Sequence, residues 1–226
     1  MRRRSLMMAA VLWPLAAVGA CASSENERTL PSGDVTALPS PDVATGVTLA
    51  AALARRRSRR EYAERGLNRA EVSQLMWAAQ GVTSDGGLRT APSAGALYPL
   101  TICVALPDGL YRYTPKGHVV ERAFEEDLRV ALGKAALGQQ WVGRAPAVFA
   151  VSGDVSRSEP KYGSRAERYV FMEAGHAAQN LLLQAVALGL AGVPVGAFDD
   201  DAVRTVLRLP GREQPIYLMP VGQPLA

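Results

Sequence analysis

The chain contains few of the residues that build metal sites and disulfide frameworks. Its 226 residues include only two cysteines, Cys21 and Cys103, and two histidines, His118 and His176. A zinc site needs several such ligands close together, so this composition argues against a transition-metal centre. Cys103 lies in the apolar run 100–106 and is expected to be a small buried core residue rather than half of a disulfide.

The chain also lacks a strong excess of charge once its N-terminus is set aside. The formal net charge is +4, from 25 basic and 21 acidic residues. Arg2, Arg3 and Arg4 are three of the basic residues, and without them 22 basic residues face 21 acidic ones, a net charge of +1. We therefore expect no nucleic acid partner. The length and the 48% share of hydrophobic residues fit one domain with a sizeable core.

Residues 1–20 have the features of a lipoprotein-type signal peptide. Three arginines precede the uncharged stretch 5–20, which is short for a membrane span. The sequence Val18-Gly19-Ala20-Cys21 resembles a bacterial lipobox, in which Cys21 would be lipidated and become the mature N-terminus. The alternatives are an ordinary secretory signal and an uncleaved hydrophobic anchor. Residues 3–7, RRSLM, also resemble a twin-arginine signal, the export route of proteins that fold around a cofactor.

These features predict an exported, membrane-anchored lipoprotein that faces the periplasm or the cell exterior. Its membrane contact would be made only through the N-terminal lipid anchor. Residues 21–46 are rich in Ser, Pro, Thr and Asp, which predicts a flexible, disordered tether. The folded domain is therefore predicted over residues 47–226.

Helices and strands alternate along this predicted domain. Apolar residues three and four positions apart predict helices over 68–80, 128–137, 165–190 and 199–207. Apolar runs bounded by turn residues predict strands over 100–106, 110–113, 119–120, 145–151 and 214–221. Helices combined with a mostly antiparallel sheet give the α+β class.

The longest predicted helix, 165–190, is apolar around almost its whole circumference. Such a helix is expected to be buried on every side, which in a chain of this size often requires a second copy. Its polar stripe consists of His176, Gln179 and Asn180. We expect these three side chains to make core hydrogen bonds and not to take part in catalysis.

Two loops have compositions typical of ligand-binding segments. Residues 89–99, RTAPSAGALYP, combine small residues with two prolines, so a rigid backbone could lie close against a planar cofactor. An ordinary turn-rich connector is the alternative. Residues 55–62, RRRSRREY, place five arginines around Ser58, a pattern that suits phosphate oxygens. A solvated basic patch is the alternative, and no aromatic residue lies between the arginines to stack on bases.

Five motifs occur in an order that resembles the FMN-dependent nitroreductase superfamily. They are RSRR at 57–60, APSAGALYP at 91–99, KYG at 161–163, EAGHAAQNLLLQAVALGL at 173–190 and PVGQP at 220–224. Within the superfamily the set resembles the SagB-type dehydrogenases, whose best-known members oxidise azolines to azoles in modified peptides. The resemblance covers residues 48–224. It implies a nitroreductase-like fold with an antiparallel central sheet flanked by helices, and a homodimer with flavin sites at an interface built around the long buried helix.

The resemblance also implies FMN as the cofactor and assigns its contacts. The positions that hold the phosphate and ribityl chain match Arg56, Arg57, Ser58 and Arg60. The loop that lies along the flavin matches Pro92, Ser93, Ala94, Gly95 and Ala96. The stretch whose backbone N–H approaches the redox-active ring nitrogen matches Val195, Gly196 and Ala197, for which an ordinary strand-end turn is the alternative. FMN is favoured over FAD because no Rossmann-type GxGxxG follows a strand.

This chain departs from the family pattern in two places. Many nitroreductases carry Asn or a similar polar residue where this sequence has Ala96. Many also carry basic residues just after the PVG element, whereas this sequence stops at Ala226. Phosphate binding would therefore depend more strongly on the arginines near residue 57.

Lys161 and Tyr162 match a Lys-Tyr pair that serves substrate deprotonation in azoline dehydrogenases, although a simple polar loop would look similar. The implied activity is that of an FMN-dependent oxidoreductase, which transfers hydride between a donor, bound FMN and a small organic substrate such as a nitro compound or quinone. One alternative is an azoline dehydrogenase acting on thiazoline or oxazoline rings in a peptide. The second is a flavin-binding lipoprotein without turnover.

Overall fold

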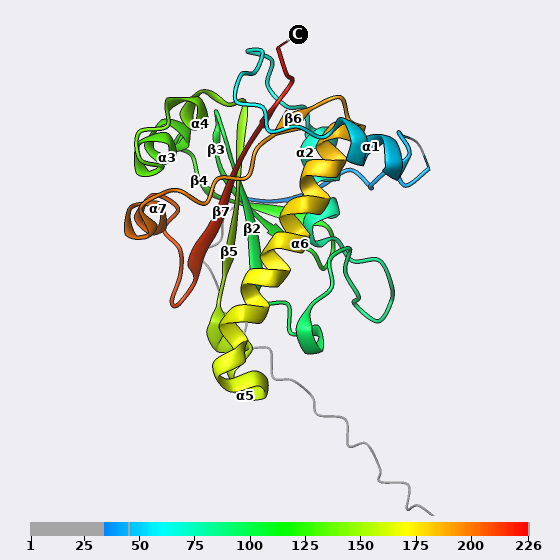
Figure 1. Ribbon diagram of the computed structural model, residues 1–226, viewed down its shortest axis with the longest axis vertical. Helices are drawn as coiled ribbons and strands as arrows, with labels where there is room; N and C mark the ends of the chain where they lie inside the picture. Colours follow the sequence, from blue (N-terminus) through cyan, green and yellow to red (C-terminus); the bar gives the residue numbers. More distant parts are fainter. Residues whose placement is uncertain (1–33, 45, 226) are drawn as a thin grey trace, which may run out of the picture. The chain divides into compact units, whose positions relative to one another are not determined.

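A seven-stranded antiparallel sheet forms the centre of the molecule (Figure 1). The computed structural model describes residues 34–44 and 46–225, and the predicted signal peptide and lipobox lie outside this range. The strand order is β1-β4-β3-β2-β5-β7-β6, and every neighbouring pair runs antiparallel. The expected α+β class with an antiparallel sheet flanked by helices is confirmed.

The elements have the following bounds. The strands are β1 (Val35–Ala37), β2 (Leu100–Leu106), β3 (Gly109–Thr114), β4 (Val119–Phe124), β5 (Ala147–Gly153), β6 (Ala191–Gly192) and β7 (Gln214–Gly222). The α-helices are α1 (Leu49–Arg55), α2 (Arg69–Gln80), α3 (Arg129–Ala135), α4 (Gln140–Arg144), α5 (Glu159–Tyr162), α6 (Ala166–Ala187) and α7 (Asp200–Val206). Short 3-10 helices occur at η1 (Ala94–Ala96), η2 (Val155–Arg157) and η3 (Gly163–Arg165).

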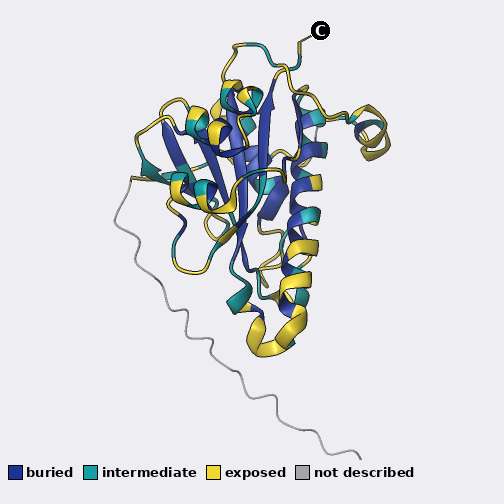
Figure 2. Cartoon of the chain, turned by 60° about the vertical axis from the view of Figure 1, so that its left-hand side comes forward, coloured by how far each residue is buried: buried dark blue, intermediate teal, exposed yellow. Residues whose placement is uncertain are grey.

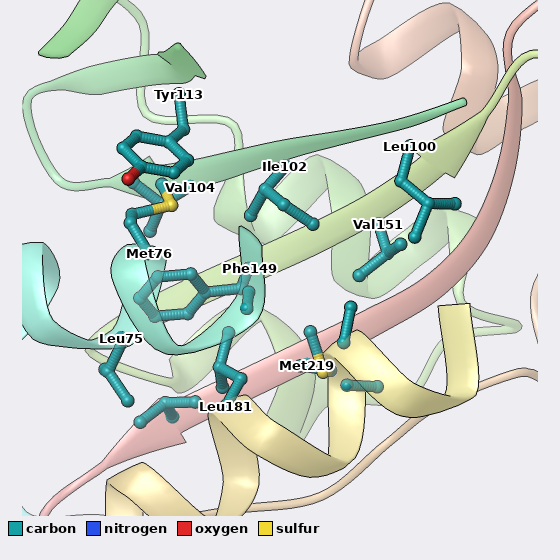
Figure 3. Packing of buried hydrophobic residues seen from close by; sticks show 14 of the residues in the cluster. Leu75, Met76, Leu100, Ile102, Val104, Tyr113, Phe149, Val151, Leu181 and Met219 are labelled. Atoms are coloured by element: carbon teal, nitrogen blue, oxygen red, sulfur yellow. The ribbon is translucent and has the colours of Figure 1, made fainter. Parts of the chain in front are cut away.

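Helices cover both faces of the sheet because successive strand residues point to opposite sides. On β5, Phe149 packs in one core cluster with residues of α2 and α6, while its neighbour Ala150 packs in a second cluster with residues of α3 and α7. Figure 3 shows the first cluster, in which Phe149 lies between Met76 of α2 and Leu181 of α6. Cys103 belongs to the second cluster and is buried as predicted, and burial raises the pKa of its thiol to about 12.

Helix α2 illustrates how local sequence fixes an element. Asn68 accepts a hydrogen bond from the backbone of Glu71, and the Glu71 carboxylate accepts one from the backbone of Asn68, which closes a capping box. Gly81 ends the helix. These are the bounds predicted from the sequence.

The segment predicted as a tether is folded over its C-terminal part, so the boundary at residue 46 was placed too late. Strand β1 pairs with β4 along the edge of the sheet. Further along the segment, Asp42 exchanges two backbone hydrogen bonds with the side chain of Gln74. Composition failed here because the segment is held mostly by backbone hydrogen bonds, with Leu38 as the apolar side chain that packs against the core.

Within one copy, helix α6 is buried along one face only, so the expected burial on every side is not reached without a second copy (Figure 2). Phe171 and Met172 are 44% and 54% exposed, and His176 and Gln179 are exposed as well. Of the predicted polar stripe, Asn180 makes a core-facing hydrogen bond, from its amide to the Thr90 carbonyl at 3.1 Å. In the described part of the chain, no helix is long and apolar enough to cross a membrane.

Candidate active site

The predicted loop at 92–96 has a left-handed, tightly held backbone. Gly95, Ala96 and Tyr98 all have positive φ, of 63°, 55° and 47°. Residues other than glycine have a strained backbone at such φ angles. Backbone strain of this kind is frequent at functional sites. The Ser93 hydroxyl accepts a hydrogen bond from the Tyr98 backbone at 2.9 Å, which closes the loop on itself.

A buried carboxylate fixes the same loop to α6. Glu173 Oε1 accepts a hydrogen bond from the Ala94 backbone N–H at 2.8 Å. Among the residues that the structure describes, Glu173 is the only acidic side chain that is buried. Burial raises the pKa of its carboxyl, while the bonds from Ala94 and Ser93 oppose that shift. Glu173 was not among the predicted site residues, although an acid between apolar positions in the middle of a long helix was a usable signal.

Lys161 and Tyr162 lie directly over this loop. A Cβ placed on Gly95 would stand 2.6 Å from Lys161 Nζ and 2.8 Å from the Tyr162 hydroxyl. Helix α5, which carries both side chains, is fixed by backbone hydrogen bonds from Lys161 and Tyr162 to the Ser158 carbonyl. The ring of Tyr162 also packs edge-on against Tyr169 of α6, with 5.0 Å between centroids. We call residues 92–96 with Lys161 and Tyr162 the loop cluster.

The predicted arginines gather elsewhere, beside the end of the sheet. Ser58 pairs with Gly192 of β6, and the Tyr62 hydroxyl donates to the Pro220 carbonyl of β7 at 3.1 Å. The Arg60 guanidinium lies 5.3 Å from the ring centroid of Trp141 in α4. The RRRSRREY and PVGQP motifs are therefore neighbours in the fold.

The stretch 195–197 joins this second group through the chain segment before α4. Gln139, two residues before Trp141, donates from its side-chain amide to the Ala197 carbonyl at 2.9 Å. Val195 exchanges two backbone hydrogen bonds with Leu218 of β7, which holds the stretch against the sheet. The backbone N–H groups of Gly196 and Ala197 donate to no group among the described residues. We call Arg56, Arg57, Ser58, Arg60 and residues 195–197 the arginine cluster.

The two clusters lie toward opposite ends of α6. The loop cluster is anchored at Glu173 and α5, whereas the arginine cluster begins at β6, beyond the C-terminus of the helix (Figure 1). At 1.5 Å per residue, the helix from Glu173 to Ala187 alone spans roughly 21 Å. The structure thus brings the predicted site residues together as two groups and does not join these groups within one chain.

The residues of both clusters fit a phosphate-bearing planar cofactor. Within the described residues, none of the cationic side chains of Arg56, Arg57 and Arg60 pairs with an acidic residue, so these arginines remain available to an anion. Gly196 has no atom within 4 Å of the position that a Cβ would take, which leaves open space beside its free N–H. No group of acidic, His or Cys side chains in the described residues could hold a metal ion.

Comparison with known proteins identifies the fold that carries these clusters. The model of the Nitroreductase family matches residues 53–223. The chain belongs to the nitroreductase family. It is 42% identical over 197 residues to a Methanocaldococcus jannaschii protein named "Putative nitroreductase MJ1384", an alignment that covers 84% of this chain and 98% of that relative.

Solved structures agree with this assignment. A crystal structure from Ralstonia eutropha JMP134, named as a putative nitroreductase, is similar with a TM-score of 0.78 and 32% identity, over 87% of this chain and 95% of that one. Another of the same description, from Anabaena variabilis, has a TM-score of 0.75 and 28% identity, over 85% of this chain and 42% of that one. The NADPH:FMN oxidoreductase of Vibrio harveyi shares the fold, with a TM-score of 0.60 and 19% identity, over 79% of this chain and 69% of that one. The expected nitroreductase-like fold is confirmed.

Proposed function

We propose that this nitroreductase-family chain is an FMN-dependent oxidoreductase whose active site is completed by a second copy of the chain. The observation that carries the proposal is the separation of the loop cluster from the arginine cluster along α6. In a symmetric dimer, the arginine cluster of one copy can face the loop cluster of the other. The exposed apolar side chains of Phe171 and Met172 on α6 offer a surface for such a contact.

The two clusters would hold different parts of the cofactor. Arg57 and Ser58, with Arg56 and Arg60, provide donors for the phosphate and ribityl oxygens. The small residues of the loop let the flavin ring approach the backbone, and the free N–H of Gly196 is a donor toward the ring. When bound, FMN supplies the two-electron chemistry that connects a hydride donor with a small organic acceptor such as a nitro compound or quinone.

The contact of Lys161 and Tyr162 with Gly95 favours the azoline dehydrogenase as a second candidate. Both side chains contact the loop that is expected to face the flavin ring. A substrate ring stacked on the flavin would lie beside them. Lys161 can take the proton that leaves the substrate carbon as hydride departs, and the Tyr162 hydroxyl can hold the substrate nitrogen. A nitro or quinone reductase has no need of this base, so the Lys161→Ala variant distinguishes the two activities.

The composite site is testable with mixed dimers. Arg57→Ala and Lys161→Ala chains carrying different tags are co-expressed, and the mixed dimer is isolated. If the site combines the two copies, one site in this dimer carries both changes and the other carries neither, so we expect about half of the wild-type turnover with the substrate that depends on Lys161. If each site lies within one chain, the mixed dimer is as impaired as its parents.

The absence of any turnover would favour the remaining alternative, a flavin-binding protein without catalysis. Screens with a nitroaromatic compound, a quinone and a thiazoline-containing peptide, each with reduced and oxidised FMN-loaded protein, cover both directions of hydride transfer. Loss of peptide oxidation in Lys161→Ala with FMN retained supports the dehydrogenase. Unchanged peptide oxidation in Lys161→Ala would show that Lys161 is not the base.

We also propose that the protein is exported and held at the membrane by a lipid on Cys21. The lipobox-like sequence at residues 18–21 supports this proposal. The Cys21→Ala variant should leave the membrane fraction without loss of FMN. Equal membrane association of both proteins would contradict lipidation of this residue.

A further inference from the structure

Two arginines without an acidic partner flank the far side of the loop cluster. The guanidinium of Arg89 lies 4.1 Å from the ring centroid of Tyr98. Arg157 Nη2 donates to the Leu97 carbonyl at 3.4 Å. Within the described residues, neither arginine forms an ion pair with Asp or Glu. Both therefore contact the loop at the residues that directly follow Gly95 and Ala96.

The environment of Arg89 is costly for a positive charge. Its side chain is half-buried, and within the described residues that side chain donates one hydrogen bond, to the neutral Gln80 Oε1 at 3.0 Å. Burial lowers the pKa of the guanidinium, and the nearby charge of Arg157 lowers it further, while Tyr98 and Tyr113 oppose the shift. A partly buried charge without a counter-charge destabilises a fold, and groups kept in this condition are frequent at binding sites. A bound anion would remove this cost.

The loop itself provides no compensating charge. Its neighbouring carboxylate, Glu173, is committed to the Ala94 N–H. Lys161 adds a third basic side chain, at Gly95. Basic side chains from two parts of the chain, residue 89 and the stretch 157–161, thus lie against residues 95–98, where the substrate of the proposed oxidoreductase would lie.

We propose that Arg89 and Arg157 bind an anionic group, a carboxylate or a phosphate, on the molecule that reacts at the loop cluster. The exposed Arg157 is free to move toward the ligand, while Arg89 is held in place by Tyr98 and Gln80. Such a pair presents two donor forks that match the paired oxygens of either anion. The statement that the anion belongs to the substrate rests on the proposed function, but its binding can be measured separately.

The test is calorimetric titration of the full-length protein, with and without added FMN, using three probes of similar shape. Benzoate carries a carboxylate, phenyl phosphate carries a phosphate, and benzamide is neutral. We expect at least one anion to bind about tenfold or more tightly than benzamide, and the stronger of the two identifies the preferred group. Equal affinities for all three probes, or no binding of either anion, would overturn the proposal.

Variants then assign the binding to the two arginines. Arg157→Gln should weaken anion binding about tenfold and leave benzamide unchanged, and Arg157→Lys should restore part of the affinity. Arg144→Gln, which removes an exposed arginine from α4 on the opposite face of the sheet, is the matched control. Because Arg89→Gln removes packing on Tyr98 and can disturb folding, Arg157 decides the outcome, and anion binding that is unchanged in Arg157→Gln would refute the proposal.

The same samples separate this proposal from the proposed function. FMN retention is read from the absorbance spectrum after desalting. If the protein binds an anion through Arg157 but retains no FMN, the proposal of a flavoenzyme is refuted and the proposal of an anion site stands. FMN retention with equal affinities for benzoate, phenyl phosphate and benzamide would keep the flavoenzyme and remove the anion site.

Discussion

Lys161 Nζ lies within 2.6 Å of the position that a Cβ on Gly95 would occupy. This relationship places a basic side chain from α5 against the backbone of a loop that is far away in the sequence. It also explains why the loop requires glycine at this position. Any side chain on residue 95 would compete with Lys161 and with the Tyr162 hydroxyl for the same space.

The Gly95→Ala variant should therefore lose activity that depends on Lys161. The added methyl group must displace the Lys161 and Tyr162 side chains, and a positive φ is expected to cost about 1–2 kcal/mol for alanine. Chemical denaturation measures the second effect and steady-state turnover the first. Gly189→Ala is the control, because Gly189 also has a positive φ of 72° but has no atom within 4 Å of its Cβ position. Equal loss of turnover in both variants would show that the Lys161 contact is unimportant.

Glu173→Ala should loosen the loop cluster. The half-buried Ala94 N–H would lose its acceptor, and we expect a loss of about 1 kcal/mol, the lower end of the cost of an unsatisfied donor. Glu173→Gln keeps an acceptor oxygen and should lie between the alanine variant and the wild type. Free energies of unfolding from denaturant titrations give the ranking. A Glu173→Ala protein as stable as the wild type would indicate that the hydrogen bond contributes nothing to the loop.

Much of the fold could be predicted from local sequence, whereas the candidate site could be predicted only in part. The capping box at Asn68 and the apolar runs of β2 and β5 specify their elements through neighbouring residues, so these elements were predictable, β2 to the residue and β5 to within two residues. Strand β1 has three residues with one half-buried side chain, and its pairing with β4 cannot be read from composition.

The composition of the site loops indicated ligand binding, but it did not predict which residues contact these loops. The small residues at 93–96 predicted a close approach without saying to what. The contacts of Gly95 with Lys161, Ala94 with Glu173 and Tyr98 with Arg89 all join distant parts of the chain. The face of α6 that one copy leaves exposed could not be located, because an apolar surface for a second copy and an apolar core produce the same sequence pattern.

His118 contacts the folded N-terminal segment at Pro39. The free energy of unfolding should therefore depend on the protonation of His118. Its Nδ1 lies 2.8 Å from the Tyr113 hydroxyl, and its Nε2 lies 2.7 Å from the Ser73 hydroxyl and 3.0 Å from the Pro39 carbonyl. Burial lowers the pKa of His118 below its ordinary value near 6.5, although the bond to Pro39 opposes this. The unfolded chain therefore binds more protons as pH falls through about 6.5, and the folded state loses stability there.

We expect the difference in unfolding free energy between the wild type and His118→Gln to shrink as pH is lowered from 8 to about 5. Parallel denaturant titrations across this range measure it, and the variant cancels the contribution of other titrating groups. A difference that stays constant would exclude proton linkage at His118.

Arg57→Ala should weaken FMN retention about tenfold or more, because a charge-assisted contact to phosphate is among the stronger hydrogen bonds. Arg57 now donates only to carbonyl groups at the end of α1, so its removal should leave the fold intact. Fluorescence titration with FMN gives the affinity, and Arg144→Ala, which removes an exposed arginine of α4, is the control. Equal FMN affinity in Arg57→Ala and the wild type would place the phosphate elsewhere.

The most direct test of the central claim is the amount and identity of flavin held by the purified full-length protein. The protein is incubated with FMN, desalted and examined by absorbance spectroscopy, and the released cofactor is identified by mass. The account predicts one FMN per chain in a protein whose solution mass is that of a dimer. A well-folded dimer that retains no FMN would contradict it.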